Sequence, residues 1–191
     1  MSANRTYHHG ALRHAMLAAA VDALTEVGAS ELSLRDLARR AGVSHAAPAH
    51  HFGNKAGLLT ALATEGFELL ADMVRDAQSH THDFVEVGIT YVRFAIEHRG
   101  HFEVMYRPDL YNADNVALRE AQQRAAGILN DGMTSLSQDA SDADILVGGV
   151  AAWSLVHGFA TLWLHGALPP ALGKDVGAAV RAAARVLFPT P

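Results

Sequence analysis

The sequence predicts an all-α protein of about nine helices, and two observations support this fold class. Apolar residues recur at the three- and four-residue spacing of helices along almost the whole chain. No segment shows the strict alternation of polar and apolar residues, bounded by turns, that is typical of a β-strand. The 191 residues suffice for a sizeable core, because a chain of this length buries roughly 70% of its unfolded surface.

The first predicted helix carries an apolar stripe and ends near Gly28, since glycine is common directly after a helix. The stripe consists of Leu12, Met16, Ala20, Leu24 and Val27. Residues 33–52 then predict two short helices joined by a tight turn. Gly42 stands where a left-handed cap is needed, and Ser44 suits the N-cap of the second short helix. This layout is typical of a DNA-reading helix-turn-helix, so residues 1–54 form the first predicted domain.

The rest of the chain, residues 55–191, predicts a second domain that is a helical bundle. Asn54 is the expected N-cap of its first helix, and the pair Pro169-Pro170 forces a break before its last one. The expected helices lie at 55–78, 84–99, 101–107, 114–136, 142–167 and 173–187.

One apolar segment, residues 145–173, contains no Asp, Glu, Lys or Arg and is long enough to span a bilayer. His157 and His165 would then lie in hydrocarbon, and no basic cluster flanks either end. We therefore expect a helix of a soluble protein, buried on nearly all sides, and no membrane partner.

Charge is unevenly distributed along the chain. Residues 1–60 contain six Lys/Arg and four Asp/Glu, a net charge of +2, whereas residues 61–191 contain nine and sixteen, a net charge of −7. Six of the twelve histidines also lie in residues 1–60, and any that protonate beside phosphates add positive charge. Only the first third therefore suits a polyanionic partner. The absence of cysteine fits a reducing cytoplasm, and residues 1–16 do not resemble a secretory signal.

The motif G-x-x-x-L-S-L-R-x-L-A-x-x-A-G-V-S, followed by H-F-x-N-K-x-x-L-L, extends from Gly28 to Leu59. It resembles the DNA-binding domain of TetR-type transcriptional regulators. Tyr7-His8-His9-Gly10, together with the segment from Ala152 to Gly158 (AWSLVHG), resembles a subgroup named for a Trp-His-Gly C-terminal signature. The resemblance implies a homodimeric, cytoplasmic regulator. It would be a repressor that a small apolar or aromatic effector releases from a palindromic double-stranded DNA operator.

The resemblance also implies that the third helix, about Ser44 to His51, lies in the major groove. The residues expected to contact DNA are Ser44, His45, Ala46, Ala49, His50, His51, Lys55, Arg5 and Tyr7. Ser44 and Lys55 are the phosphate candidates, each at a helix N-terminus. The base-facing candidates are His45, Ala46, Ala49 and His50. Where the family usually has an apolar residue and Tyr, this chain has Pro48 and Ala49, and the missing Tyr hydroxyl can lower affinity for the DNA backbone.

The bundle is expected to hold an apolar effector pocket with Tyr and His as polar groups. Its expected lining is Phe67, Leu70, Met73, Tyr91, Phe94, Phe102, Met105, Tyr106, Trp153, His157 and Phe159. The resemblance implies that the last two helices pair across the dimer, and the small residues of the first of these helices agree with this, because they let backbones approach closely. The expected interface residues are Gly149, Ala152, Trp163, Val180, Ala184 and Leu187.

Two other functions compete with this interpretation. His80 with His82, or His98 with His101, would supply imidazoles to a metal-responsive regulator of the same fold. The second competing function is that of a ligand-binding helical protein that has lost DNA binding. The sequence contains no G-x-S-x-G, no H-E-x-x-H and no phosphate-binding glycine loop, so we predict no enzyme, no cofactor and no resident metal.

Overall fold

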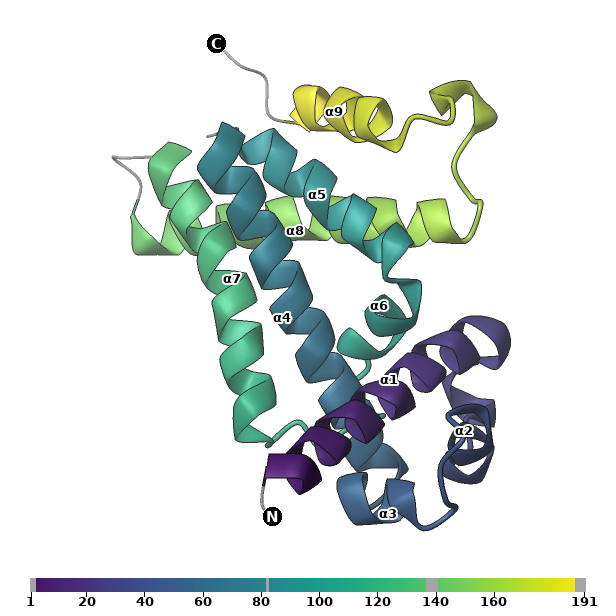
Figure 1. The fold of residues 1–191 in the computed structure, drawn as a ribbon. Helices are drawn as coiled ribbons and strands as arrows, with labels where there is room; N and C mark the ends of the chain where they lie inside the picture. The colour runs from purple at the N-terminus through teal and green to yellow at the C-terminus, as the bar shows by residue number, and fades with distance from the viewer. Residues whose placement is uncertain (1–2, 82, 137–140, 188–191) are drawn as a thin grey trace. The chain divides into compact units, whose positions relative to one another are not determined.

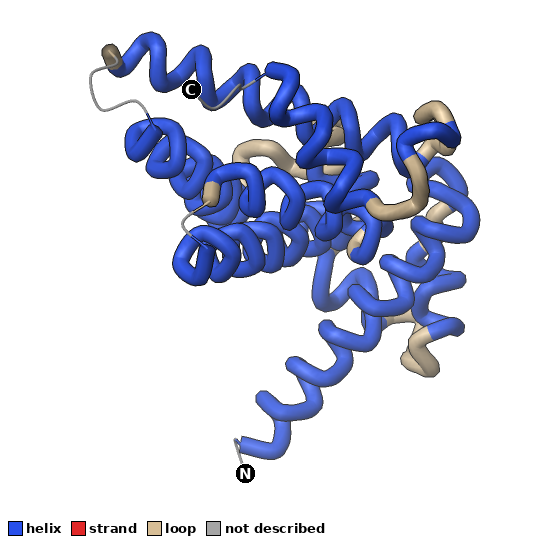
Figure 2. Tube along the Cα trace, turned by 90° about the horizontal axis from the view of Figure 1, so that it is seen from above, coloured by secondary structure: helices blue, strands red, loops and turns tan. Residues whose placement is uncertain are grey.

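The computed structural model describes residues 3–81, 83–136 and 141–187, and its regular structure over these residues is entirely helical (Figure 2). The α-helices are α1 (Ala3–Glu31), α2 (Leu34–Arg40), α3 (Ala47–Phe52), α4 (Lys55–Thr81), α5 (Phe84–Glu97), α6 (Arg99–Met105), α7 (Val116–Leu136), α8 (Asp142–Leu164) and α9 (Val176–Leu187) (Figure 1). A short 3-10 helix, Pro170–Leu172, follows the proline pair. The all-α prediction is confirmed.

The chain forms two compact units, each made of two stretches of the sequence, and the domain boundary after residue 54 stays a prediction. The first unit comprises Met1–Phe67 and His98–Glu120, and the second comprises Glu68–Glu97 and Ala121–Pro191. α4 is one continuous helix whose first turns belong to the first unit. Leu58, Leu59 and Leu62 of these turns are fully buried.

The first unit contains α1, α2, α3 and α6, with α6 lying along α1 (Figure 1). Met16, Ala20 and Leu24 of the predicted α1 stripe are buried, whereas Val27 is 47% exposed. Gly28 interrupts the helical backbone with φ 75° and ψ 173°, so the predicted helix end is confirmed. Val27 is the last residue of the stripe and directly precedes this break, which accounts for its exposure.

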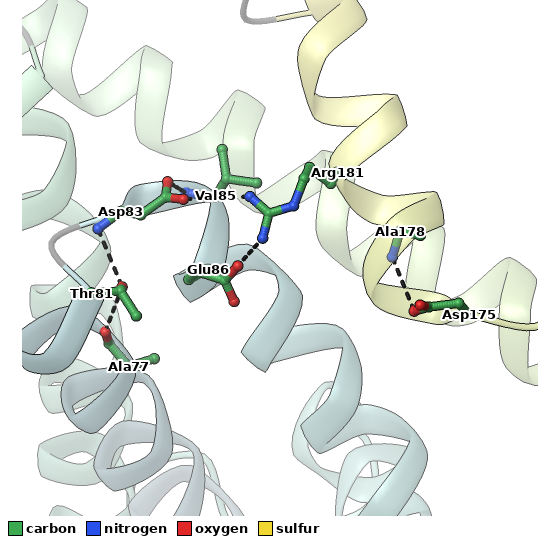
Figure 3. Close-up of polar contacts among 8 residues, drawn as sticks. All are labelled: Ala77, Thr81, Asp83, Val85, Glu86, Asp175, Ala178 and Arg181. Carbon is green, nitrogen blue, oxygen red and sulfur yellow. Dashed lines mark hydrogen bonds and ion pairs between the residues drawn. The ribbon is translucent and has the colours of Figure 1, made fainter.

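The second unit is organised around α5, which packs against both α8 and α9. Val87, Ile89, Tyr91, Val92 and Phe94 of α5 are buried. Arg181 joins α9 to α5, because its guanidinium donates to Glu86 and lies 3.4 Å from Asp83 Oδ2 (Figure 3). The Asp175 side chain accepts from Ala178 N at the start of α9, as an N-cap does.

The expectation that α8 is buried on nearly all sides is wrong for the single chain. α8 is the described helix long and apolar enough to cross a membrane, yet most of its most apolar stretch is exposed. Leu146, Val147 and Val150 are 60%, 68% and 51% exposed. The prediction fails because α8 packs mainly against α5, which covers only part of the surface of this apolar helix.

Candidate functional site

The third helix, α3, begins at Ala47, so the predicted N-cap at Ser44 is wrong. Residues 44–47 instead form a turn in which Ala47 N donates to the Ser44 carbonyl over 3.0 Å. Pro48 explains the later start, because a proline is tolerated in the first turn of a helix but removes a hydrogen bond farther in.

The predicted base-facing side chains lie on or next to the outer side of α3. His45, Ala46, Ala49 and His50 are exposed, as is Ser44 in the preceding turn. Pro48 points inward and is buried. His51 is half-buried, and its ring lies at 5.5 Å from that of His50. The structure therefore brings these residues together on one short, accessible element.

Lys55 lies at the start of α4, and its ammonium already forms a hydrogen bond within the chain. Its Nζ donates to the Ser30 carbonyl over 3.1 Å, which joins α4 to the end of α1. Gly57 N donates to Asn54 Oδ1 over 2.9 Å, so Asn54 is the predicted N-cap of α4. The Lys55 ammonium keeps further donors, since an ammonium carries three hydrogens.

An ion-pair network on α2 was not predicted. The Asp36 carboxylate accepts from both Arg39 and Arg40, and Arg40 also donates to Glu26 of α1 over 2.7 Å. The hydrogen bonds from Arg40 and Arg39 lower the pKa of Asp36. The spacing of Asp36 to Arg39 and Arg40 was visible in the sequence, whereas the link to Glu26 depends on how α2 packs on α1.

Two further residues expected at DNA, Arg5 and Tyr7, lie where the structure describes the α1 backbone but not the side chains. Their role stays a prediction.

The residues expected to line an effector pocket fall into both units. Phe67, Phe102, Met105 and Tyr106 belong to the first unit, where the Tyr106 ring lies 5.5 Å from those of Phe67 and Phe102. Leu70, Met73, Tyr91, Phe94, Trp153, His157 and Phe159 belong to the second unit.

Three of the second-unit residues form a hydrogen-bonded chain between α5 and α8. Trp153 Nε1 donates to Tyr91 Oη over 3.2 Å, and Tyr91 Oη lies 2.9 Å from His157 Nδ1. The indole can only donate, so the phenol accepts from it and has its own hydrogen for His157. Burial lowers the pKa of His157, which favours the neutral ring that can accept at Nδ1. Sequence reasoning proposed all three residues but not their mutual contact.

Two family models match this chain. The model described as bacterial regulatory proteins of the tetR family matches residues 16–62. The model described as the tetracyclin repressor-like C-terminal domain matches residues 84–187, more than half of the chain. The chain belongs to the tetR family.

Solved structures agree with this assignment. A protein of unknown function from Rhodococcus sp. RHA1 is 34% identical, with 94% of this chain and 95% of that chain covered and a TM-score of 0.77. A TetR family transcription regulator from Marinobacter aquaeolei VT8 is 20% identical, with coverages of 93% and 96% and a TM-score of 0.68. The regulator FadR from Bacillus subtilis, in complex with stearoyl-CoA, is 17% identical, with coverages of 92% and 97% and a TM-score of 0.69. No curated protein matches the chain.

DNA binding through a helix-turn-helix, response to a ligand, a homodimeric state and a cytoplasmic location are typical of the tetR family, whose members are typically not enzymes. The C-terminal model spans Ala152 to Gly158, the segment that resembles the Trp-His-Gly signature. Membership of that subgroup stays a prediction.

The tetR-family dimer is expected to use the last two helices, but most of the predicted interface residues are already buried within the single chain. Gly149, Ala152, Val180 and Ala184 are buried. α8 and α9 both pack against α5, and Gly149 faces Leu129 and Asn130 of α7. Trp163 is half-buried and stacks on Phe159 with ring centroids 6.1 Å apart. The side chain of Leu187 lies outside the described residues. The exposed apolar side chains of α8 are others: Leu146, Val147, Val150, Trp153 and Leu162.

The described residues contain no group of three or more His, Asp or Glu side chains that could hold a metal ion. His82 lies outside them, so the pair His80 and His82 stays untested. In the other predicted pair, the His98 and His101 rings lie 5.9 Å apart, and His101 Nε2 lies 3.1 Å from Glu65 Oε1.

Proposed function

We propose that this tetR-family protein is a cytoplasmic repressor that binds a palindromic operator as a homodimer and is released by a small apolar or aromatic effector. The observation that carries the proposal is the outer side of α3, where Ala46, Ala49 and His50 are exposed while Pro48 anchors the helix inward. An exposed short helix of this kind fits the major groove.

We infer a division of roles between bases and phosphates at this surface. The His50 ring can donate to a purine acceptor, and the Ala46 and Ala49 methyl groups can contact a thymine methyl. Ser44 and Lys55 suit the DNA backbone, which fixes register rather than sequence. Ala49 supplies no hydroxyl, so phosphate contacts depend on these two residues, on His51, and on Arg5 and Tyr7.

Selection of bound sites from a random double-stranded DNA pool tests this proposal. We expect an enriched palindrome whose half-sites are separated by about one helical turn, roughly 34 Å, because a twofold dimer reads two half-sites. A protein with His50→Ala and Ala46→Asp provides the matched control and should enrich nothing. Enrichment of a single half-site would contradict dimeric reading, and no enrichment by the wild type would contradict DNA binding.

The exposed side of α8 supports the homodimer. Leu146, Val147, Val150 and Leu162 expose apolar surface along one helix, and monomeric soluble proteins rarely leave such a surface uncovered. Gly158 has open space where a Cβ would stand, so nothing in the single chain requires a glycine there. A second copy of α8 lying against this side explains both features.

The second unit supports the effector. Leu70, Phe94 and Phe159 are buried apolar side chains of this unit, and the chain of Trp153, Tyr91 and His157 supplies polar groups that can orient a ligand. Met73 is half-buried. FadR from Bacillus subtilis, of the same fold, was crystallised with stearoyl-CoA, a ligand with a long apolar part. An effector that is mainly apolar with one polar end suits the residues present here.

The sequence contains two tryptophans, Trp153 and Trp163, which makes intrinsic fluorescence a direct test. We expect the apolar aromatic probe anilinonaphthalene sulfonate to quench wild-type emission in a saturable way. Quenching should persist in Trp163→Phe, where Trp153 is the reporter, and should weaken in Tyr91→Phe. Quenching that is unchanged in Tyr91→Phe and lost only in Trp163→Phe would place the bound probe elsewhere.

A further inference from the structure

The short helix α6 is pressed against α1 at a glycine. A Cβ built on Gly100 would lie 2.7 Å from the carbonyl oxygen of Val21. Atoms at that distance overlap, and a backbone carbonyl in the middle of α1 cannot turn aside. Gly100 therefore allows an approach between α6 and α1 that no other residue permits.

α6 also contacts the first half of α4, here through its side chains. A Cβ built on Gly66 would lie 2.7 Å from Met105 Sδ and 3.0 Å from His101 Cβ. Tyr111 Oη donates to the Met105 carbonyl over 2.9 Å, which holds the end of α6 from the following loop. The seven residues of α6 thus lie between α1 and α4. Gly100 stands at the contact with α1, and Gly66 stands at the contact with α4.

A polar contact also joins α6 to α4. His101 is 5% exposed, and its Nε2 lies 3.1 Å from Oε1 of Glu65, the residue next to Gly66. The hydrogen bond from His101 lowers the pKa of Glu65. Arg13 and His14 of α1 also act electrostatically on Glu65, and the His98 ring lies 5.9 Å from that of His101.

The second ring nitrogen of His101, Nδ1, indicates why a histidine stands at position 101. His101 Nδ1 is the buried side-chain polar atom without a hydrogen-bond partner in the described part of the chain. A buried polar atom without a partner costs free energy, which an apolar side chain of similar size would avoid. Packing alone therefore does not account for histidine at position 101, whereas the contact of Nε2 with Glu65 does.

We propose that Glu65 and His101 are a positioning pair that fixes α6 between α4 and α1 and thereby sets the position of α1, on which the DNA-reading helices α2 and α3 are built. The two glycines let α6 come close to its neighbours, but a glycine has no side chain that could form a directional contact. The hydrogen bond is directional and selects one register. The part of this inference that concerns operator affinity rests on the proposed function.

The two nitrogens of histidine can be separated by substitution. A glutamine places its amide nitrogen near the Nε2 position, whereas an asparagine places its amide near Nδ1. We therefore expect His101→Gln to keep the contact with Glu65, and His101→Asn and Glu65→Gln to weaken it. Glu103→Gln is the matched control, because Glu103 lies on the same helix and makes an exposed pair with Arg99.

Amide hydrogen exchange of the purified full chain reads out the position of α6. We expect the amides of residues 102–105, and those of α1 near Val21, to exchange about tenfold faster in His101→Asn and Glu65→Gln, since a lost buried hydrogen bond lowers the cost of local opening. His101→Gln and Glu103→Gln should match the wild type. Equal exchange in His101→Gln and His101→Asn would overturn the proposal, whether both are fast or both are slow.

Affinity for the operator selected above is the second measurement. The affinity should fall in His101→Asn and Glu65→Gln and stay unchanged in His101→Gln and Glu103→Gln. Fast exchange with unchanged affinity would overturn the link to α1, and the proposed function would stand. A wild type that binds no DNA would overturn the proposed function, and hydrogen exchange would still decide the role of the pair.

Discussion

Tyr91 Oη of α5 lies 2.9 Å from His157 Nδ1 of α8 and also accepts from Trp153 Nε1. Trp153 and His157 are the first two residues of the sequence signature Trp-x-x-x-His-Gly, and one phenol oxygen joins them. The i,i+4 spacing of the signature is the spacing that brings two side chains to the same side of a helix. Tyr91 is therefore a hydrogen-bond partner that both residues share.

Burial lowers the pKa of His157 below its ordinary 6.5, and this gives a pH dependence with a definite sign. The unfolded chain binds this proton near pH 6.5 and the folded chain only at lower pH, so the free energy of unfolding decreases as pH falls below about 6.5. We expect denaturant midpoints to fall less between pH 7 and 5 in His157→Asn than in the wild type. An equal fall in both proteins would assign the dependence to other histidines.

Gly100→Ala should destabilise the first unit. The new Cβ would lie 2.7 Å from the Val21 carbonyl oxygen, and relief requires α6 or α1 to shift. Overpacking of this kind costs about 1–3 kcal/mol. Gly127→Ala is the control, because open space surrounds that position in α7 and alanine favours a helix by roughly 0.5–1 kcal/mol. Urea unfolding of both variants measures the difference, and a neutral Gly100→Ala would contradict the close approach.

Lys55→Ala should weaken binding to all DNA sequences and lower the salt dependence by about one counterion, because the proposed phosphate contact of its ammonium would be lost. His50→Ala should instead alter base preference within the selected operator. Lys55→Arg keeps the positive charge and should keep the salt dependence of the wild type. Titrations at several salt concentrations check the division. Equal losses of both variants on scrambled DNA would refute it.

Operator affinity should rise as pH falls from about 8 to 6, since histidines that gain a proton beside phosphates add attraction. His45 and His50 are exposed and His51 is half-buried on the proposed DNA surface. Band-shift titrations across this range test the effect. A triple variant with glutamine at all three positions should give a flat profile, and a flat wild-type profile would remove the prediction.

Val150→Glu should convert the dimer to a monomer. Val150 is 51% exposed in the middle of the apolar side of α8, and a carboxylate there would be buried without a partner by a second copy. Val116→Glu, at a valine 61% exposed on α7, is the matched control and should leave the dimer intact. Sedimentation at several concentrations gives the result, and a dimeric Val150→Glu would exclude this side of α8.

Local sequence signals predicted local structure well. The break at Gly28, the N-cap at Asn54 and the end of the chain's short sixth helix before Pro108 all follow from backbone chemistry of a few residues. The start of α3 was misplaced by three residues because two local signals conflicted. Ser44 favoured an early cap, whereas Pro48 required a late one, and the missing proline N–H decided the outcome.

The sequence by itself determined the all-α fold class, the helix-turn-helix and the tetR-family membership, because these depend on spacing along the chain. Only the tertiary structure decided which sides of α8 and α9 are occupied. Both helices are apolar enough to pack on α5 or on a partner, and contact with α5 buries Val180 and Ala184 while leaving Val147 and Val150 exposed. The pairs Glu65 with His101 and Tyr91 with His157 also emerge only there, since each joins residues far apart in the chain and depends on where two helices meet.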